Sequence, residues 1–181
     1  MIRAFFRRCG ETHGEQHAAA YELLYAAASF CGREISADDV KKTEQGKPYV
    51  EGSPEIYISI SHSGECAAVL ISDVPCGIDI EKIKDISERV SKRYLGSATG
   101  QEALIRWTER ESYGKLEGGG FFSGETIPNE AEFRYFSDDG YLVTVCFIGN
   151  ETEVPLYCLF DGEFVSRGSM VSRCAINSLG D

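Results

Sequence analysis

Residues 77–81, Gly-Ile-Asp-Ile-Glu, are the stretch that decides how this chain folds. Apolar and acidic side chains alternate along it, and a period of two predicts a short β-strand. Ile78 and Ile80 then share one face of the strand, while Asp79 and Glu81 share the other. We therefore expect an apolar face on one side of the strand and two carboxylates on the other.

Further strands are predicted on both sides of this one. Residues 56–61 (IYISIS) alternate, and residues 65–72 (ECAAVLIS) form a second strand-like run. Residues 132–148 (EFRYFSDDGYLVTVCFI) predict a hairpin with Asp139 and Gly140 at its turn. A weakly alternating segment at residues 2–8 and an apolar run at residues 156–160 are strand candidates near the two ends of the chain.

Helices are predicted between these strands. Residues 14–29 are rich in alanine and leucine and predict a helix that Gly32 ends. Residues 36–39 resemble the start of a short helix. Residues 86–95 and 101–115 predict two more helices, and a run of three glycines follows the second.

This mixture predicts an α+β protein with two lobes that meet near residues 73–85. The lobe boundaries are residues 1–75 and residues 76–181, the second lobe being compact and ending in a polar tail. A chain of 181 residues is long enough for one domain or for two small lobes that share a core.

Composition excludes several classes of protein. The net charge of -11 disfavours nucleic acid as a partner, because nonspecific binding to nucleic acid needs a basic surface. No apolar run approaches the ~20 residues that cross a bilayer, so no membrane association is expected. The N-terminal residues lack the apolar segment of a signal peptide, so we expect a cytoplasmic protein.

The seven cysteines predict neither disulfides nor a metal centre. Their number is odd, none forms a CxxC pair, and several lie inside apolar segments. Reduced, buried cysteines that pack as small hydrophobic side chains are the expected state.

Three carboxylates are candidates for chemistry. Asp79 and Glu81 share a strand face, and Glu111 lies on the predicted helix four residues before Lys115, so the last two point the same way. Three hard oxygen ligands suit Mg²⁺, which takes its other ligands from water and substrate phosphate. From the spacing alone, solvated surface charges with a helical ion pair are the more common explanation, because exposed pairs of this kind are common.

Two shorter segments carry groups that can bind phosphate. Lys47 follows Gly46 and precedes Pro48, so a cation lies on a stiff turn. Ser61 and His62 directly follow a predicted strand, and hydroxyl and imidazole groups can donate hydrogen bonds to phosphate oxygens.

The order and spacing of these segments resemble the Sfp-type 4'-phosphopantetheinyl transferases. The segments that carry the resemblance are GKP at 46–48, ISHSG at 60–64, GIDIEK at 77–82 and WTERESYGK at 107–115. The resemblance spans roughly residues 13 to 147.

The resemblance implies a Mg²⁺-dependent enzyme with coenzyme A as co-substrate. Such an enzyme transfers the 4'-phosphopantetheine group to a serine of an apo acyl or peptidyl carrier protein and releases 3',5'-adenosine bisphosphate. The implied fold is a pseudo-twofold pair of lobes with coenzyme A in the cleft between them, and the implied state is a monomer.

The resemblance also implies roles for individual residues. Asp79, Glu81 and Glu111 match the magnesium ligands, and Lys115 matches the lysine that contacts the coenzyme A phosphates. Lys47 and Pro48 match the turn beside the nucleotide, and Ser61 and His62 match residues that touch the phosphates. Glu111 and Lys115 are the catalytic candidates, with Glu111 the first candidate for the base.

The chain departs from the family pattern at three places that bear on activity. Arg110 replaces a lysine, His17 lies where an arginine usually grips coenzyme A, and the segment 95–106 is short. These departures leave open a non-catalytic relative that binds coenzyme A or a carrier protein. A trimeric holo-acyl-carrier-protein synthase is the other alternative, although its N-terminal metal aspartate has no counterpart here.

Overall fold

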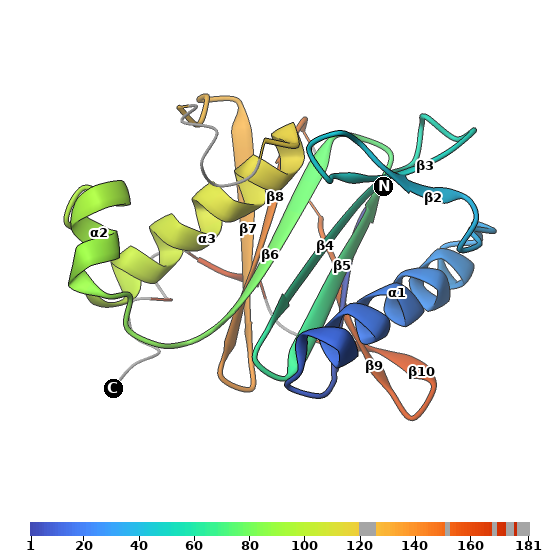
Figure 1. Ribbon diagram of the computed structural model, residues 1–181, viewed down its shortest axis with the longest axis horizontal. Coiled ribbons are helices and arrows are strands. Elements are labelled where there is room, and N and C mark those ends of the chain that lie inside the picture. The colour runs from blue at the N-terminus through green and yellow to red at the C-terminus, as the bar shows by residue number, and fades with distance from the viewer. Residues whose placement is uncertain (120–125, 151–152, 168–169, 173–175, 177–181) are drawn as a thin grey trace.

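The computed structural model describes residues 1–119, 126–150, 153–167, 170–172 and 176. The fold is mixed α+β, as the sequence predicts (Figure 1). The last of the three glycines after the second long helix, Cys174 and the polar tail beyond residue 176 lie outside the described residues.

The first sheet holds strands from both ends of the chain. Its order is β10-β9-β1-β5-β4. The strands are β1 (Ile2–Arg8), β4 (Tyr57–Ser63), β5 (Cys66–Ser72), β9 (Leu156–Phe160) and β10 (Glu163–Arg167). Strand β9 pairs in parallel with β1, so a C-terminal segment completes the sheet that the N-terminus begins.

The second sheet has the Gly-Ile-Asp-Ile-Glu strand at one edge. Its order is β11-β7-β8-β6. The strands are β6 (Cys76–Lys82), β7 (Ala131–Asp138), β8 (Tyr141–Ile148) and β11 (Met170–Val171). The turn between β7 and β8 has positive φ at Asp139 (45°) and Gly140 (77°), which confirms the predicted hairpin.

Each sheet carries a long helix on its outer face. Helix α1 (His13–Phe30) covers the first sheet, and a capping box between Thr12 and Glu15 starts it. Helix α3 (Gly100–Glu117) covers the second sheet and ends at Gly118, whose φ of 88° makes a left-handed cap. The short α2 (Glu88–Tyr94) precedes α3.

The segment between α1 and β4 differs from the prediction. Residues 37–39 form a turn, so the expected helical start is wrong. The Asp39 carboxylate accepts hydrogen bonds from the backbone N–H (2.8 Å) and the hydroxyl (2.6 Å) of Ser36, a local pattern that competes with a helix. The chain then enters a small sheet of β2 (Val40–Lys42) and β3 (Pro48–Val50).

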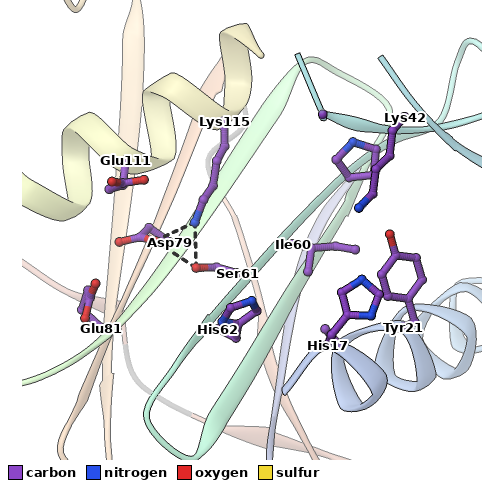
Figure 2. A pocket seen from close by; sticks show the side chains of 13 residues that line it. His17, Tyr21, Lys42, Ile60, Ser61, His62, Asp79, Glu81, Glu111 and Lys115 are labelled. Atoms are coloured by element: carbon purple, nitrogen blue, oxygen red, sulfur yellow. Dashed lines mark hydrogen bonds and ion pairs between the residues drawn. The ribbon is translucent and has the colours of Figure 1, made fainter. Parts of the chain in front are cut away.

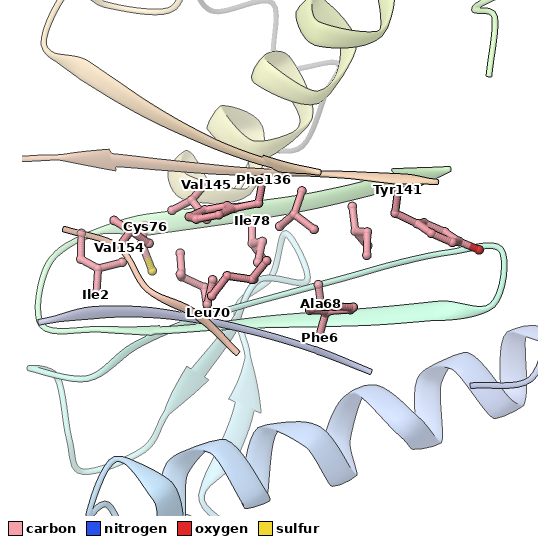
Figure 3. Close-up of a cluster of buried hydrophobic side chains, with 14 of the residues drawn as sticks. Ile2, Phe6, Ala68, Leu70, Cys76, Ile78, Phe136, Tyr141, Val145 and Val154 are labelled. Carbon is pink, nitrogen blue, oxygen red and sulfur yellow. The ribbon is translucent and has the colours of Figure 1, made fainter. Parts of the chain in front are cut away.

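The main core lies between the inner faces of the two large sheets (Figure 3). Ile78 and Ile80 of β6 are fully buried there, together with Leu70 of β5 and Val145 of β8. The predicted apolar face of β6 is therefore confirmed. Asp79 and Glu81 consequently point away from this core, and Asp79 contacts Lys115 of α3.

Two further observations bear on the composition. Of the cysteines within the described residues, six are free, and Cys66, Cys76 and Cys146 are buried. In the part of the chain that the structure describes, no helix is both long enough and apolar enough to cross a membrane.

Candidate functional site

A cavity of about 360 Å³ opens where the two sheets meet, with α1 on one side and α3 on the other (Figure 2). Strands β4 and β6 form its floor. It is lined by His17, Ala20, Tyr21, Lys42, Gly46, Pro48, Ile60, Ser61, His62, Asp79, Glu81, Glu111 and Lys115. Seven of the eight predicted site residues therefore line it, and Lys47 is the one that does not.

Serine side chains of β4 connect this strand to β6 where the two strands run side by side in the floor of the cavity. Three alternate serines of β4 each accept a hydrogen bond from a backbone N–H of β6. The donor–acceptor pairs are Ile78 to Ser59 (3.1 Å), Ile80 to Ser61 (3.2 Å) and Lys82 to Ser63 (3.4 Å). These hydroxyls satisfy edge-strand N–H groups that would otherwise be unpaired.

Asp79 is the centre of the polar network in the cavity. Its Oδ1 accepts hydrogen bonds from the Ser61 hydroxyl at 2.9 Å and from the Lys115 ammonium at 2.7 Å. Lys115 also donates to Ser61 Oγ at 2.7 Å, which closes a three-membered network (Figure 2). Asp79 is only 3% exposed, and among the described residues its Oδ2 has no hydrogen-bond partner.

The other two carboxylates border Asp79 from different elements. Glu81 Oε2 accepts a hydrogen bond from the Ser63 hydroxyl at 2.8 Å. Burial raises the pKa of Glu111, and the nearby Asp79 carboxylate raises it further. The acids thus interact electrostatically across the cavity wall. In the described residues, however, no group of three or more His, Cys, Asp or Glu side chains is drawn together as a ready-made metal cluster.

The opposite wall of the cavity carries imidazole, phenol and ammonium groups. His17 and Tyr21 of α1, Lys42 of β2 and His62 of β4 line it (Figure 2). Burial lowers the pKa of His62, with smaller effects in the same direction from His13 and Lys115. Lys42 was not among the residues predicted for this site, because no local pattern marks it and it reaches the cavity only through the β2–β3 fold of the 40–50 segment.

Lys47 and Pro48 occupy different positions relative to the cavity. Pro48 lines it, whereas Lys47 lines an adjoining cavity of about 210 Å³. The Lys47 ammonium donates to the backbone carbonyl of Leu116 at the end of α3. Burial lowers the pKa of Lys47. Its charge therefore stabilises the carboxyl end of that helix, where cations are favoured.

The departures in α3 lie outside the cavity. Arg110 follows Glu109 on α3 and is not among the residues that line the cavity in the described part of the chain. The short segment 95–106 begins at Leu95, the C-cap of α2, and contains the loop up to Thr99, the N-cap of α3, and the first turns of α3.

The cavity places carboxylates and a lysine on one side and imidazole and ammonium groups on the other, and side chains of this kind belong to the class that can bind phosphate esters. Known proteins with similar sequences agree with this class. A 4'-phosphopantetheinyl transferase, ffp, from Bacillus subtilis is 32% identical over 156 residues, covering 74% of this chain and 68% of the relative. Another, gsp from Aneurinibacillus migulanus, is 31% identical over 147 residues, covering 73% and 58%.

The chain belongs to the Sfp-type 4'-phosphopantetheinyl transferase family. The transferase Sfp of Bacillus subtilis (strain 168) is 34% identical over 89 residues, covering 42% of this chain and 40% of Sfp. Apart from ffp, the chain spans between 39% and 58% of the length of the curated relatives it matches. No protein-family model matches the chain.

Proposed function

We propose that this protein transfers the 4'-phosphopantetheine group of coenzyme A to a serine of an apo carrier protein. The observation that supports this most is the network of Asp79, Ser61 and Lys115 in a cavity that also contains Glu81 and Glu111. In the reaction, the serine oxygen bonds to the β-phosphorus of the pyrophosphate. The bond to 3',5'-adenosine bisphosphate breaks, and the serine proton leaves.

Lys115 is proposed to bind the pyrophosphate. Its ammonium is held by Asp79 and Ser61 at the wall of the cavity, where an anion that enters the cavity can contact it. A fixed cation at this point stabilises the negative charge that develops on the leaving phosphate in the transition state. Asp79 therefore also acts as the residue that orients Lys115.

The carboxylates suit a divalent cation, which we propose is Mg²⁺. Asp79 Oδ2 is buried without a hydrogen-bond partner among the described residues, and Glu81 and Glu111 supply further hard oxygen donors. Mg²⁺ is usually held by one or two carboxylates together with substrate phosphates, so a complete protein cage is not required. When bound, Mg²⁺ would neutralise charge on the pyrophosphate.

Glu111 is the candidate for the group that accepts the serine proton. Its carboxylate lines the same cavity as Lys115, and a base must lie within hydrogen-bond reach of the proton that it accepts. Ser61 and His62 are proposed to contact phosphate oxygens from β4. Pro48 and the backbone of the turn that contains Lys47 are proposed to border the nucleotide, because the Lys47 ammonium is already engaged by α3.

The pseudo-twofold, two-lobe arrangement is part of the same proposal. The order strand, long helix, hairpin occurs twice, as β1–α1–β4–β5 and as β6–α3–β7–β8. In each case the hairpin's second strand pairs antiparallel with the first strand of the unit. This recurrence supports lobes of residues 1–75 and 76–181, with β9 and β10 returning to the first sheet.

A monomer in the cytoplasm is the proposed state of the protein. Both walls of the cavity come from one chain, so the site needs no second copy. The free cysteines fit a reducing compartment. The mass in solution distinguishes this proposal from the trimeric alternative.

The test is mass spectrometry of apo carrier proteins incubated with this protein, coenzyme A and Mg²⁺. We expect the phosphopantetheine mass increment on at least one carrier, and we expect EDTA or Asp79→Asn to abolish it. Asp85→Asn, at an exposed acid outside the cavity, is the matched control and should retain transfer. Coenzyme A binding without transfer to any carrier would support the non-catalytic alternative.

A further inference from the structure

The turn between β4 and β5 is held by hydrogen bonds from two different elements. The carbonyl oxygen of Gly64 accepts a hydrogen bond from the side-chain amide of Gln16 on α1, at 2.6 Å. The backbone N–H of Glu65 donates to the hydroxyl of Tyr141 on β8, at 3.0 Å. These two backbone groups belong to one peptide bond. A single peptide unit therefore connects the helix that covers the first sheet to a strand of the second sheet (Figure 1).

Both side chains that hold this peptide are buried. Gln16 is 9% exposed and Tyr141 is 3% exposed. The Gln16 amide also donates to the Glu11 carbonyl at 3.3 Å, which ties the segment before α1 to the same turn. Gly64 has a left-handed φ of 54°, and a Cβ atom there would lie 2.6 Å from the Tyr141 hydroxyl oxygen, so the turn packs closely against β8. Buried hydrogen bonds of this kind rigidify the backbone that they join.

Ser63, the last residue of β4, lies directly before this turn. Its hydroxyl donates a hydrogen bond to Glu81 Oε2 at 2.8 Å and accepts one from the backbone N–H of Lys82 at 3.4 Å. The ammonium of Lys84 lies 3.8 Å from the same Glu81 oxygen, on a side chain that is 61% exposed. An exposed lysine holds a carboxylate weakly, so the hydrogen bond from Ser63 is the better-defined contact of Glu81.

This hydrogen bond engages one of the two carboxylate oxygens of Glu81 and leaves the other for a ligand. Glu81 lines the same cavity as Asp79 and Glu111. Carboxylates that bind a metal ion are themselves held by hydrogen bonds, and loss of such a supporting contact costs about 10–100-fold in metal affinity. Ser63 is placed to supply this support.

We propose that Ser63 is a positioning residue for Glu81. Tyr141 and Gln16 keep Ser63 in place through the β4–β5 turn. The inference rests on the proposed function, because that function makes Glu81 a ligand of a divalent cation. In the described part of the chain, neither Ser63 nor Tyr141 nor Gln16 lines the cavity, so each acts through Glu81 and not on the substrate.

The turn matters because strand pairing frays most readily at the end of a hairpin. Ser63 pairs with Cys66 at the end of the β4–β5 ladder, so its backbone is fixed only as well as the turn is fixed. Removing the Tyr141 hydroxyl takes away the partner of the Glu65 N–H and loosens the turn. Ser63 then no longer holds the Glu81 carboxylate in one orientation.

Metal binding by the full chain tests the proposal without relying on activity. The probe is Mn²⁺, whose free form gives an EPR signal, titrated with and without coenzyme A. Ser63→Ala should weaken Mn²⁺ binding about tenfold, whereas Ser63→Thr keeps the hydroxyl and should bind as the parent does. In the transfer assay, the Mg²⁺ concentration that gives the half-maximal rate should rise about tenfold for Ser63→Ala, and saturating Mg²⁺ should restore the rate.

Tyrosine variants test the contact through the turn. Tyr141→Phe removes only the hydroxyl and should weaken Mn²⁺ binding, by less than Ser63→Ala does, and Gln16→Met should act in the same direction. Tyr135→Phe is the matched control. It removes a buried tyrosine hydroxyl on the neighbouring strand β7 that donates to Glu109, which does not line the cavity within the described residues, and it should leave Mn²⁺ binding unchanged. The double variant Ser63→Ala/Tyr141→Phe should bind Mn²⁺ as Ser63→Ala does, because both changes act through one contact.

The outcomes separate this inference from the proposed function. A folded parent protein that binds no Mn²⁺, with or without coenzyme A, would overturn the divalent-cation proposal and this inference with it. Equal Mn²⁺ binding by the parent and by Ser63→Ala would overturn the inference alone. Equal losses in Tyr141→Phe and Tyr135→Phe, or additive losses in the double variant, would overturn the role of the turn. If Ser63→Ala does not fold, the comparison of Tyr141→Phe with Tyr135→Phe decides the proposal in its place.

Discussion

Replacing Gly77 by alanine should displace α3 from the sheet that carries Asp79. A Cβ atom at position 77 would lie 1.9 Å from the carbonyl oxygen of Ser112 and 2.7 Å from the backbone nitrogen of Leu116. Both contacts are backbone atoms of α3, so no side-chain rotation relieves them. The helix must retreat by about 1 Å or more, and overpacking of this kind costs about 1–3 kcal/mol, here at the upper end.

The same displacement should lower activity beyond the loss of stability. Glu111 and Lys115 are on α3, whereas Asp79 is on β6, two residues after Gly77. A shift of the helix would break the 2.7 Å contact between the Lys115 ammonium and Asp79 Oδ1. Misplacement of a reacting group by about 1 Å can reduce a rate about 100-fold.

Urea denaturation followed by circular dichroism measures the first effect, and carrier modification by the folded variant measures the second. Gly14→Ala is the matched control for stability, because no atom lies within 4 Å of the added Cβ and the residue is in α1. It should leave stability unchanged or raise it by up to about 1 kcal/mol. A Gly77→Ala protein as stable as its parent, with full activity, would refute the close contact between α3 and β6.

Three other changes have definite expected outcomes. Ser61→Ala removes one hydrogen-bond partner from the backbone N–H of Ile80 and one from the Asp79 carboxylate, so the free energy of unfolding in urea should fall by about 1–3 kcal/mol. An unchanged urea midpoint would contradict the role of the serines that join β4 to β6. Lys47→Met removes the donor to the last turn of α3 and should cost about 0.5–1.5 kcal/mol in the same assay, whereas unchanged stability would show that the contact contributes nothing. Burial and then Asp79 raise the pKa of Glu111 above its ordinary value of 4.5, so the folded protein favours the protonated form of this side chain. The protonated Glu111 therefore contributes to the free energy of unfolding below pH 4.5, and this contribution is lost as the pH rises through the raised pKa. Glu111→Gln in EDTA should therefore melt at a higher temperature than the parent at pH 7–8 and lose this advantage toward pH 4, and a variant less stable at every pH would contradict the prediction.

Local sequence patterns predicted most of the regular structure for a simple physical reason. Period-two alternation and the Asp-Gly turn act over a few residues, so β6 and the β7–β8 hairpin formed where expected. The predicted helix at residues 14–29 likewise formed, one residue longer at each end. Helix α2 is shorter than the predicted 86–95, because its first turn starts only after the Ser87 cap.

Long-range pairings were beyond such patterns. Strand β9 lies beside β1 in parallel, with Ala4 opposite Leu156, although 152 positions (156 minus 4) separate them in sequence. Nothing in the apolar run at 156–160 specifies its partner, because register and neighbour are fixed by the sheet that already exists. The small β2–β3 sheet was missed for a related reason: strands of three residues are too short for alternation to be recognised.

The same limit applies to the site. The motifs placed Asp79, Glu81, Glu111 and Lys115 correctly as neighbours, since strand and helix periods determine which way each points. Lys42 was missed because it reaches the cavity only through the fold of the 40–50 segment. The direction of the Lys47 ammonium was also unpredictable, since it depends on where α3 ends.

The serines of β4 show why the cavity exists at this position. Two strands that exchanged backbone hydrogen bonds would merge the sheets into one continuous surface. Between β4 and β6, hydroxyl groups take the place of backbone carbonyls as acceptors, so the two edges meet without forming a ladder. The Ser61 hydroxyl has one proton and two lone pairs, and it uses all three, on Asp79, Ile80 and Lys115. The contact that joins the sheets is therefore also the contact that orients the acid and the lysine, and a change at this serine should alter stability and ligand binding together.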